Sequence, residues 1–293
     1  MRACLLPLLC LLIASVPLRA EEAAPQRVVS LSWALTELLI ELDAPPVGAA
    51  DVEGYRQWVA EPAVPDSVAD VGLRNEPNFE RIAALAPDLI LASDQQADLV
   101  PLLERIAPVF HVESFDSGQD NAAVSRQTFL QLADRLGRRE AALARLDQLD
   151  ARIRAAGERV DDHFGENVPF VLPIRLLTPT TLRLHGENSM AKAALDAMGL
   201  VHPAPGEATD WGFVQRRVEE LATFEDVIVL QIGPFAQKHA LEETSMWRFM
   251  PFVQEGRFAQ TRRVWTFGGV FSLGYLADAF AEALLEIEPE DGQ

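Results

Sequence analysis

Short apolar runs alternate with helical patterns over roughly the first half of the chain. RVVSLS at 27–32 is typical of a strand, and ALTELLIEL at 34–42 has apolar residues at helical spacing. The alternation continues with predicted strands PPVGAA (45–50), PDLILAS (87–93) and PVFHV (108–112), and with predicted helices NFERIAALA (78–86) and ADLVPLLERIA (97–107). Strands that alternate with helices indicate an α/β domain with a mostly parallel sheet.

The segment 138–162 differs, because it contains no proline and its helical pattern is long. The apolar residues on one of its faces are Leu143, Leu146, Leu149, Ile153 and Val160. A helix of this length spans roughly 35–40 Å, and it fits either a connector between domains or a surface helix of one domain. A second set of patterns follows: VPFVLPI (168–174), TLRLH (181–185), MAKAALDAM (190–198), DVIVLQI (226–232), MWRFMPFV (246–253), RRVWTF (262–267) and SLGYLADAFAEALLEI (272–287).

These patterns predict the fold class α/β, with two α/β lobes joined by a single long backbone helix. The expected divisions are a signal peptide at 1–20, an N-terminal lobe at 21–137, the connecting helix at 138–162 and a C-terminal lobe at 163–293.

Residues 1–20 have the features of a signal peptide. The apolar run from Cys4 to Val16 is too short to span a membrane. Cleavage after Ala20 removes both cysteines, and with them any disulfide, thiolate metal site or cysteine nucleophile. The alternatives are a lipid anchor at Cys10 and a retained apolar N-terminus.

Charge and motifs exclude several functions. The formal net charge is −19, and nucleic-acid affinity rests on Lys and Arg, so we expect no nucleic-acid partner. The five histidines form no HxxxH or HExxH pair, and no GxSxG, P-loop or GxGxxG pattern is present. We therefore expect no metal site, no cofactor and no catalytic residue. The glycine-rich FGGVFSLG (267–274) is interpreted as a turn before the last helix.

Three of the five tryptophans stand at predicted strand ends or in loops. Trp33 follows VVSLS, Trp58 lies in YRQWVAEP, and Trp211 lies in the polar stretch GEATDWGF. Loops at the ends of parallel strands are where α/β domains bind ligands. For each tryptophan the alternatives are core packing and a place in a ligand cleft, and the presence of Arg74 on a nearby loop favours the cleft.

Five segments also carry a resemblance to a known family: RVVSLSWALTELL, GYRQWVAEPAVPDSVADVGLRNEPNFE, TDWGF, MWRFMPFVQEGRF and VWTFGG. In this order they resemble segments of the periplasmic ferric hydroxamate siderophore-binding proteins, the ferrichrome-type members of the class III solute-binding proteins. The resemblance implies a periplasmic monomer with a shallow ligand cleft between the two lobes. It also implies that the protein delivers a ferric siderophore to an inner-membrane ABC permease and performs no chemistry.

The resemblance implies a role for Arg74, which matches a family arginine through its DVGLR-EPN setting. The guanidinium of that arginine contacts the hydroxamate oxygens around the iron. These oxygens carry partial negative charge, and a planar guanidinium can donate two parallel hydrogen bonds to them. The alternative for Arg74 is a surface ion pair with Glu76 or Glu80.

The resemblance also implies aromatic pocket walls, formed by Trp33, Trp58, Trp211 and Trp265. Trp247 lies in a helical pattern and is expected in the core. Gln96 falls at or near the place of one family tyrosine, and Phe267 replaces a second. Hydroxamate cargo is favoured over catecholate cargo, because a bulky anionic catecholate complex would favour clustered basic residues and only Arg74 stands out.

The docking residues that the resemblance implies are one acidic residue on each lobe. The family's N-lobe glutamate falls near Pro101, so we choose Glu104 on the same predicted helix, and in the C-terminal lobe we choose Glu242 or Glu243. The alternative functions are a same-fold binding protein for haem, cobalamin or ferric citrate, and a periplasmic enzyme. Haem would require a Tyr or His axial ligand, and citrate would require more arginines.

Overall fold

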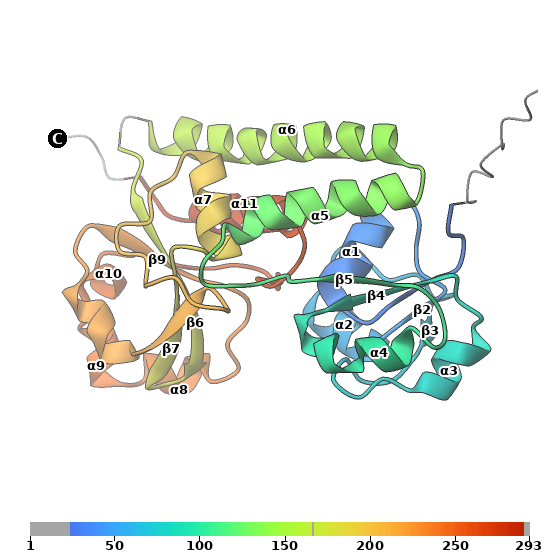
Figure 1. Cartoon of the computed structure of the whole chain (residues 1–293). Helices are drawn as coiled ribbons and strands as arrows, with labels where there is room; N and C mark the ends of the chain where they lie inside the picture. The colour runs from blue at the N-terminus through green and yellow to red at the C-terminus, as the bar shows by residue number, and fades with distance from the viewer. Residues whose placement is uncertain (1–23, 166, 290–293) are drawn as a thin grey trace, which may run out of the picture.

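The computed structural model describes residues 24–165 and 167–289, so the predicted signal peptide at 1–20 lies outside the described residues. The described residues form two α/β lobes side by side, and the long helix α6 (Arg139–Phe164) runs along both of them (Figure 1). The predicted fold class is confirmed. No helix in this part of the chain is both long enough and apolar enough to cross a membrane.

The N-terminal lobe is built on a parallel sheet with the strand order β3-β2-β1-β4-β5. Its strands are β1 (Val28–Ser30), β2 (Gly48–Ala49), β3 (Ala69–Asp70), β4 (Leu89–Ser93) and β5 (Val109–Val112). Its helices are α1 (Trp33–Glu41), α2 (Val52–Trp58), α3 (Phe79–Ala84), the 3₁₀ helix η1 (Asp94–Leu99), α4 (Val100–Leu103) and α5 (Asn121–Arg135). Strands β1 and β4 are central and buried on both faces, which explains their nearly continuous apolar sequences.

The C-terminal lobe has a mixed sheet with the order β10-β9-β6-β7-β8, in which β7 is antiparallel to both of its neighbours. Its strands are β6 (Phe170–Thr178), β7 (Thr181–His185), β8 (Phe213–Arg217), β9 (Val227–Gln231) and β10 (Phe258–Gln260). Its helices are α7 (Met190–Met198), the 3₁₀ helix η2 (Val218–Thr223), α8 (Lys238–Glu242), α9 (Ser245–Arg248), α10 (Pro251–Gln254) and α11 (Ser272–Leu284). The predicted strand at 262–267 is wrong, because these residues leave the sheet as a loop that reaches the other lobe.

Helix α6 packs through one apolar face, as predicted, but with a different first residue. Leu146, Leu149, Ile153 and Val160 are buried, whereas Leu143 is 45% exposed and Ala142 takes the buried place beside Leu146. The glycine in this helix has a packing reason. A Cβ on Gly157 would lie 2.2 Å from the Met198 carbonyl oxygen, so only glycine lets α6 approach the end of α7 this closely.

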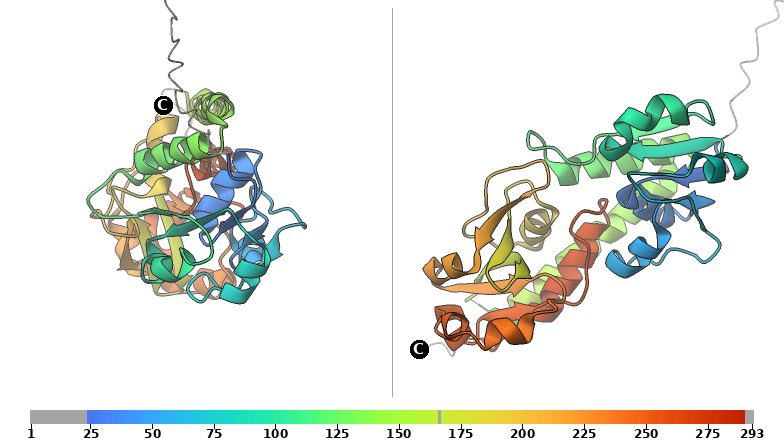
Figure 2. Two further views of the ribbon diagram at one scale, coloured as in Figure 1. Left: turned by 45° about the vertical axis from the view of Figure 1, so that its right-hand side comes forward. Right: turned by 90° about the horizontal axis from the view of Figure 1, so that it is seen from below.

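Helix α11 lies beside α6 between the lobes and packs into the same core (Figure 2). The preceding FGG sequence forms the predicted turn. A Cβ on Gly268 would lie 2.3 Å from Glu37 Oε2, so the glycine allows the turn to close over α1. Ser272 at the start of α11 donates to Glu37 from its backbone nitrogen at 2.9 Å and from its hydroxyl at 2.6 Å. This contact joins α1 of one lobe to α11 of the other.

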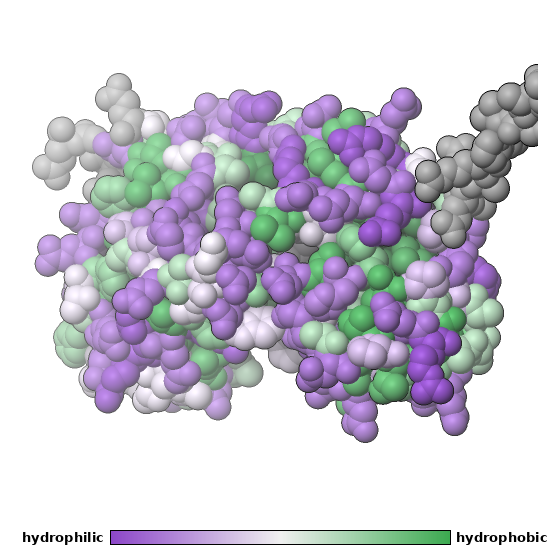
Figure 3. All heavy atoms as spheres, in the orientation of Figure 1, coloured by the Kyte–Doolittle hydropathy of each residue, from purple (hydrophilic) through white to green (hydrophobic). Residues whose placement is uncertain are grey.

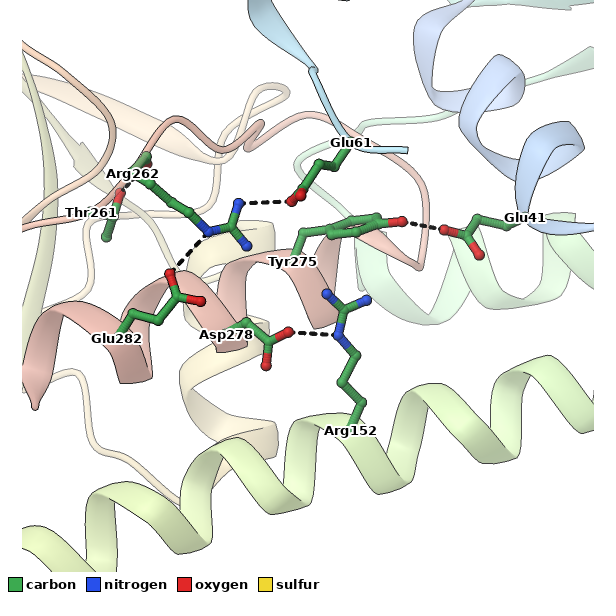
Figure 4. Close-up of polar contacts among 8 residues, drawn as sticks. All are labelled: Glu41, Glu61, Arg152, Thr261, Arg262, Tyr275, Asp278 and Glu282. Atoms are coloured by element: carbon green, nitrogen blue, oxygen red, sulfur yellow. Dashed lines mark hydrogen bonds and ion pairs between the residues drawn. The ribbon is translucent and has the colours of Figure 1, made fainter. Parts of the chain in front are cut away.

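Further polar contacts hold the lobes together around α11 (Figure 4). Arg262 pairs with Glu61 of the N-terminal lobe at 2.7 Å and with Glu282 of α11 at 3.0 Å. The Tyr275 hydroxyl of α11 donates to Glu41 of α1. Arg152 of α6 donates to Asp278 of α11 at 2.7 Å. The Thr261 hydroxyl donates to the Arg262 carbonyl at 2.7 Å. These contacts therefore fix the position of one lobe relative to the other.

Candidate ligand-binding site

A cleft between the lobes lies at the carboxyl ends of β1, β4 and β5 on one side and of β6, β9 and β10 on the other. Open α/β sheets bind ligands at this edge, where the strand order reverses, here between β1 and β4. Two adjoining hollows of about 320 and 670 Å³ occupy the cleft, and they share Trp33, Arg74, Arg183, Trp265 and Phe267. The separation of the lobes is visible at the edge opposite α6 (Figure 3).

The guanidinium of Arg74 lies over the ring of Trp33 in the N-terminal wall of this cleft. The guanidinium carbon is 3.7 Å from the centroid of the indole ring, which is a cation–π contact. The indole is fixed in turn, because it is only 5% exposed and its Nε1 donates to the backbone oxygens of Ala50 at 3.3 Å and Asp51 at 3.2 Å. The guanidinium of Arg74 thus contacts an indole ring that is fixed in the core of the lobe.

Asp51 gives Arg74 its charged partner. The Arg74 Nε lies 3.7 Å from Asp51 Oδ2, and the pairs with Glu76 or Glu80 that the sequence left open are absent from the described residues. Burial lowers the pKa of Arg74, and the charge of Asp51 opposes that effect. The Arg74 side chain is still 31% exposed, so it remains able to contact a ligand.

The structure places Gln96 behind Arg74 rather than in the cleft. Its side chain is completely buried, and its Nε2 donates to the Arg74 carbonyl at 2.8 Å. Its Oε1 accepts from the backbone nitrogen of Ser93 at 3.0 Å and from the Ser93 hydroxyl at 3.1 Å. The 3₁₀ turn of η1 directs this side chain inward and leaves the neighbouring Gln95 to line the smaller hollow. Gln96 therefore supports the loop that carries Arg74.

Aromatic side chains from both lobes meet at the floor of the cleft. The ring centroid of Trp265 lies 5.3 Å from that of Trp33 and 5.4 Å from that of Phe267, and both contacts are edge-to-face. Trp211 is 43% exposed and stacks on Phe115 of the N-terminal lobe with 6.2 Å between ring centroids. Such contacts stabilise the arrangement beyond the burial of the rings. The result is an apolar wall that continues from one lobe to the other.

The structure thus brings six of the seven predicted ligand residues to the cleft: Trp33, Trp58, Arg74, Trp211, Trp265 and Phe267. Trp58, at the end of α2, is 49% exposed and lines the larger hollow. Trp247 is buried in the core of the C-terminal lobe, as predicted.

Comparison with known proteins fits this arrangement of two lobes, one long helix and a cleft between them. The sequence profile described as "Periplasmic binding protein" matches residues 28–263. The chain belongs to the periplasmic binding protein family. This is a family of binding proteins and not of enzymes.

This periplasmic binding protein has relatives whose cargo is named. The iron(3+)-hydroxamate-binding protein FhuD of Escherichia coli is 36% identical over 250 residues, 85% of this chain and 83% of that protein. The structure of the Vibrio cholerae siderophore-binding protein FhuD with bound Fe3+–Desferal is similar with a TM-score of 0.87 and 41% identity, and the match covers 90% of this chain and 99% of that chain. The Escherichia coli Fe(3+) dicitrate-binding periplasmic protein FecB is 29% identical over 185 residues, 62% of this chain and 59% of that protein.

Sequence reasoning missed three arginines of this periplasmic binding protein. Arg175, Arg183 and Arg263 join Arg74 around the larger hollow, so the statement that only Arg74 stands out among basic residues is wrong. A signal was available, since Arg183 lies inside the predicted strand at 181–185 and Arg175 directly follows the predicted strand at 168–174. Arginine is almost never buried in a strand without a partner. Phe115 and Phe213 were also missed.

No group of three or more His, Cys, Asp or Glu side chains within the described residues could hold a metal ion. The buried His185 and His202 do not line either hollow. Burial lowers the pKa of His185 to about 3 and that of His202 to about 4, so both are neutral at pH 7. The His202 ring contacts the His185 carbonyl at 3.1 Å. Neither histidine is placed as an axial ligand for haem in the cleft.

The predicted docking residues lie on the surface of both lobes. Glu104 is exposed at the end of α4, and Glu242 and Glu243 are exposed at the end of α8. Both helices lie on the side of the molecule away from α6 (Figure 1). Glu242 lies 3.7 Å from Lys238, and Glu243 lies 3.2 Å from His239.

Proposed function

We propose that this protein binds a ferric hydroxamate siderophore in the periplasm and delivers it to an inner-membrane ABC permease. The observation that carries the proposal is the partly exposed guanidinium of Arg74, stacked on Trp33 in an aromatic cleft between two lobes. Such a guanidinium can donate charge-assisted hydrogen bonds to the iron-bound hydroxamate oxygens. The aromatic floor offers apolar contact to the organic part of the complex.

The relatives support this cargo. FhuD of Escherichia coli is named for iron(3+)-hydroxamate, and the Vibrio cholerae structure holds Fe3+–Desferal. Periplasmic location is supported by the family of the chain and by the apolar N-terminal sequence. Monomeric state and delivery to a permease are part of the same proposal.

Tryptophan fluorescence tests the cargo, because Trp33, Trp211 and Trp265 line the cleft whereas Trp247 is buried away from it. A ferric trihydroxamate should quench the emission with a Kd of about 1 μM or tighter, near −8 kcal/mol. The metal-free siderophore should bind more weakly, since it lacks the preorganised oxygen cluster. Free tryptophan in the same titration corrects for light absorbed by the iron complex. Quenching by haem or cobalamin, with none by any ferric hydroxamate, would contradict the proposal.

Delivery is tested with a triple variant that carries Glu104→Ala, Glu242→Ala and Glu243→Ala. Desolvated charge pairs at an interface cost about 2–5 kcal/mol when one partner is truncated. The triple variant should therefore bind siderophore normally but reduce permease-linked ATPase stimulation and iron uptake. Glu158→Ala on the exposed face of α6, away from the predicted docking side, is the control that should leave uptake unchanged. Normal uptake by the triple variant would show that other residues dock.

A further inference from the structure

The C-terminal wall of the cleft carries two arginines at facing positions. Arg175 on β6 and Arg183 on β7 are direct partners in the antiparallel register of these strands. Side chains of direct partners lie on the same face of a sheet, and both of these arginines line the larger hollow. Like charges placed directly opposite each other destabilise a sheet. The pair therefore has an electrostatic cost in the empty protein.

Neither arginine has an acidic partner among the residues that the structure describes. Arg175 Nη2 donates to the Val264 carbonyl at 3.1 Å, and the Arg183 guanidinium carbon lies 4.3 Å from the centroid of the Phe213 ring. The Nε of each arginine is buried without a hydrogen-bond partner. Burial lowers the pKa of both, and for Arg175 the charge of Arg183 adds to this effect and brings the pKa to about 10. Two cations thus stand close together with unused donors.

The nearby acidic residues lie on the N-terminal side of the cleft, where Asp51 pairs with Arg74 and Asp94 lines the smaller hollow. Four arginines and no acidic residue line the larger hollow, although the net charge of the chain is −19. Arg74 has Asp51 as a partner, and Arg263 donates to the Gln57 carbonyl at 2.8 Å. Apolar walls around a charge lower the local dielectric constant and strengthen its attraction for an anion. The side chains that line this half of the cleft therefore carry uncompensated positive charge.

We infer that Arg175 and Arg183 form a carboxylate subsite, which favours ferric hydroxamate complexes that carry a free carboxylate beside their iron-binding groups. The inference rests on the proposed function. Arginine is well suited to the task, because its planar donor fork matches a carboxylate. Arg183 lines both hollows, so a cargo whose hydroxamate oxygens face Arg74 can extend to the pair within the cleft. A carboxylate bound there supplies the missing negative charge and relieves the repulsion between the two cations.

Two derivatives of one trihydroxamate test this subsite. The free amine of ferrioxamine B is either acetylated or succinylated, so that the two complexes hold iron in the same way and differ by one CH2–COO− group. The mature protein should bind the succinylated complex about tenfold more tightly, as expected for one charge-assisted contact in a partly exposed site. Calorimetric titration of both complexes measures the ratio, and the ratio should fall as salt is added.

Two variants assign the preference to the arginines. Arg175→Gln and Arg183→Gln should each bring the ratio close to one, because the carboxylate of the succinylated complex then loses its charged partner. Arg216→Gln on the exposed end of β8 is the matched control and should keep the wild-type ratio. Thermal unfolding of the empty proteins checks folding. Arg183→Gln should unfold at an equal or higher temperature than the wild type, since it removes a repulsion.

The outcomes separate the subsite from the function on which it rests. Equal affinity of the wild-type protein for the two complexes would overturn the subsite and leave the proposed function intact. A preference that survives in both arginine variants would also overturn it, because the carboxylate would then bind elsewhere. Binding of neither complex would contradict the proposed function, and the inference with it.

Discussion

The two walls of the cleft hold their arginines in opposite ways. In the N-terminal wall, Arg74 has a carboxylate beside it, an indole beneath it and a glutamine that fixes its backbone. In the C-terminal wall, Arg175 and Arg183 face each other without an acidic partner among the described residues. The first arrangement is preorganised, because these three contacts already hold the guanidinium and the backbone of Arg74. The second is incomplete until an anion binds. One wall is therefore suited to a constant part of the cargo, and the other to a part that varies.

The largest predicted difference between the two walls is the loss of stability when a tryptophan in each wall is replaced by alanine. Trp33 is buried in the core and donates hydrogen bonds to two backbone oxygens, whereas Trp211 is 43% exposed. Trp33→Ala should lower the free energy of unfolding by about 3–5 kcal/mol, as for other aromatic-to-alanine changes in cores. Trp211→Ala should lower it by a smaller amount, about 0.5–1.5 kcal/mol, because the stacking contact with Phe115 is lost, and should still weaken cargo binding. Urea unfolding measures both, and equal losses would show that the walls are not different.

Removing the support behind Arg74 should have a smaller effect. Gln96→Leu keeps the approximate volume but leaves the Arg74 carbonyl and the Ser93 nitrogen without their buried partner. An unpaired buried group costs about 1–3 kcal/mol. The Ser93 nitrogen is buried and the Arg74 carbonyl is only partly buried, so stability should fall by about 1–3 kcal/mol, and cargo affinity should fall with it. The exposed neighbour provides the control, since Gln95→Leu should leave stability unchanged. If Gln96→Leu were as stable as the wild type, the loop would not depend on this side chain.

The contact between Glu37 of α1 and Ser272 of α11, which joins the two lobes, should make the stability of the protein depend on pH. Burial raises the pKa of Glu37 from 4.5 to about 8, with a further contribution from the charge of Glu41. Between these values the folded protein holds the proton more tightly than the unfolded chain does. Stability from this group is therefore fully present below about pH 4.5 and is lost as the pH rises toward 8.

Glu37→Gln removes that titration while it can keep the contacts with Ser272. Relative to the wild type, the variant should gain up to about 1.4 kcal/mol of unfolding free energy per pH unit between about pH 5 and 8. Unfolding curves at several pH values measure the gain. A constant difference between the two proteins would mean that Glu37 is not protonated in the folded state.

The fold was predictable because its main signals are local. The 3.6-residue period of α6 and the apolar runs of β1, β4 and β9 depend on neighbours in the sequence, and these predictions were confirmed. The loop at 262–267 was mistaken for a strand because its apolar residues pack into the cleft and not into a sheet. An apolar stretch alone does not distinguish these two outcomes.

The candidate site was predictable only in part. Arg74, Trp33, Trp58 and Trp211 could be found because they stand at predicted strand ends or in loops. Trp265 lay in a predicted strand and was found only through the family resemblance. The pairing of Arg175 with Arg183 depends on the register of β6 and β7, which two separate stretches of sequence do not reveal. The inward direction of Gln96 depends on the 3₁₀ turn that contains it, so its position along the chain suggested a pocket residue that the structure places behind the pocket.

The most direct test of the account is the Kd of a neutral ferric trihydroxamate for the wild-type protein and for two variants at Arg74. Arg74→Ala should weaken binding by about 1.5–3 kcal/mol, roughly 10- to 150-fold, because charge-assisted hydrogen bonds to the iron-bound oxygens are lost. Arg74→Lys should recover only part of this, since an ammonium lacks the donor fork. Arg81→Ala, which removes an exposed arginine 3.9 Å from Asp70 on the same lobe, should bind like the wild type. An unchanged Kd in Arg74→Ala would contradict the account.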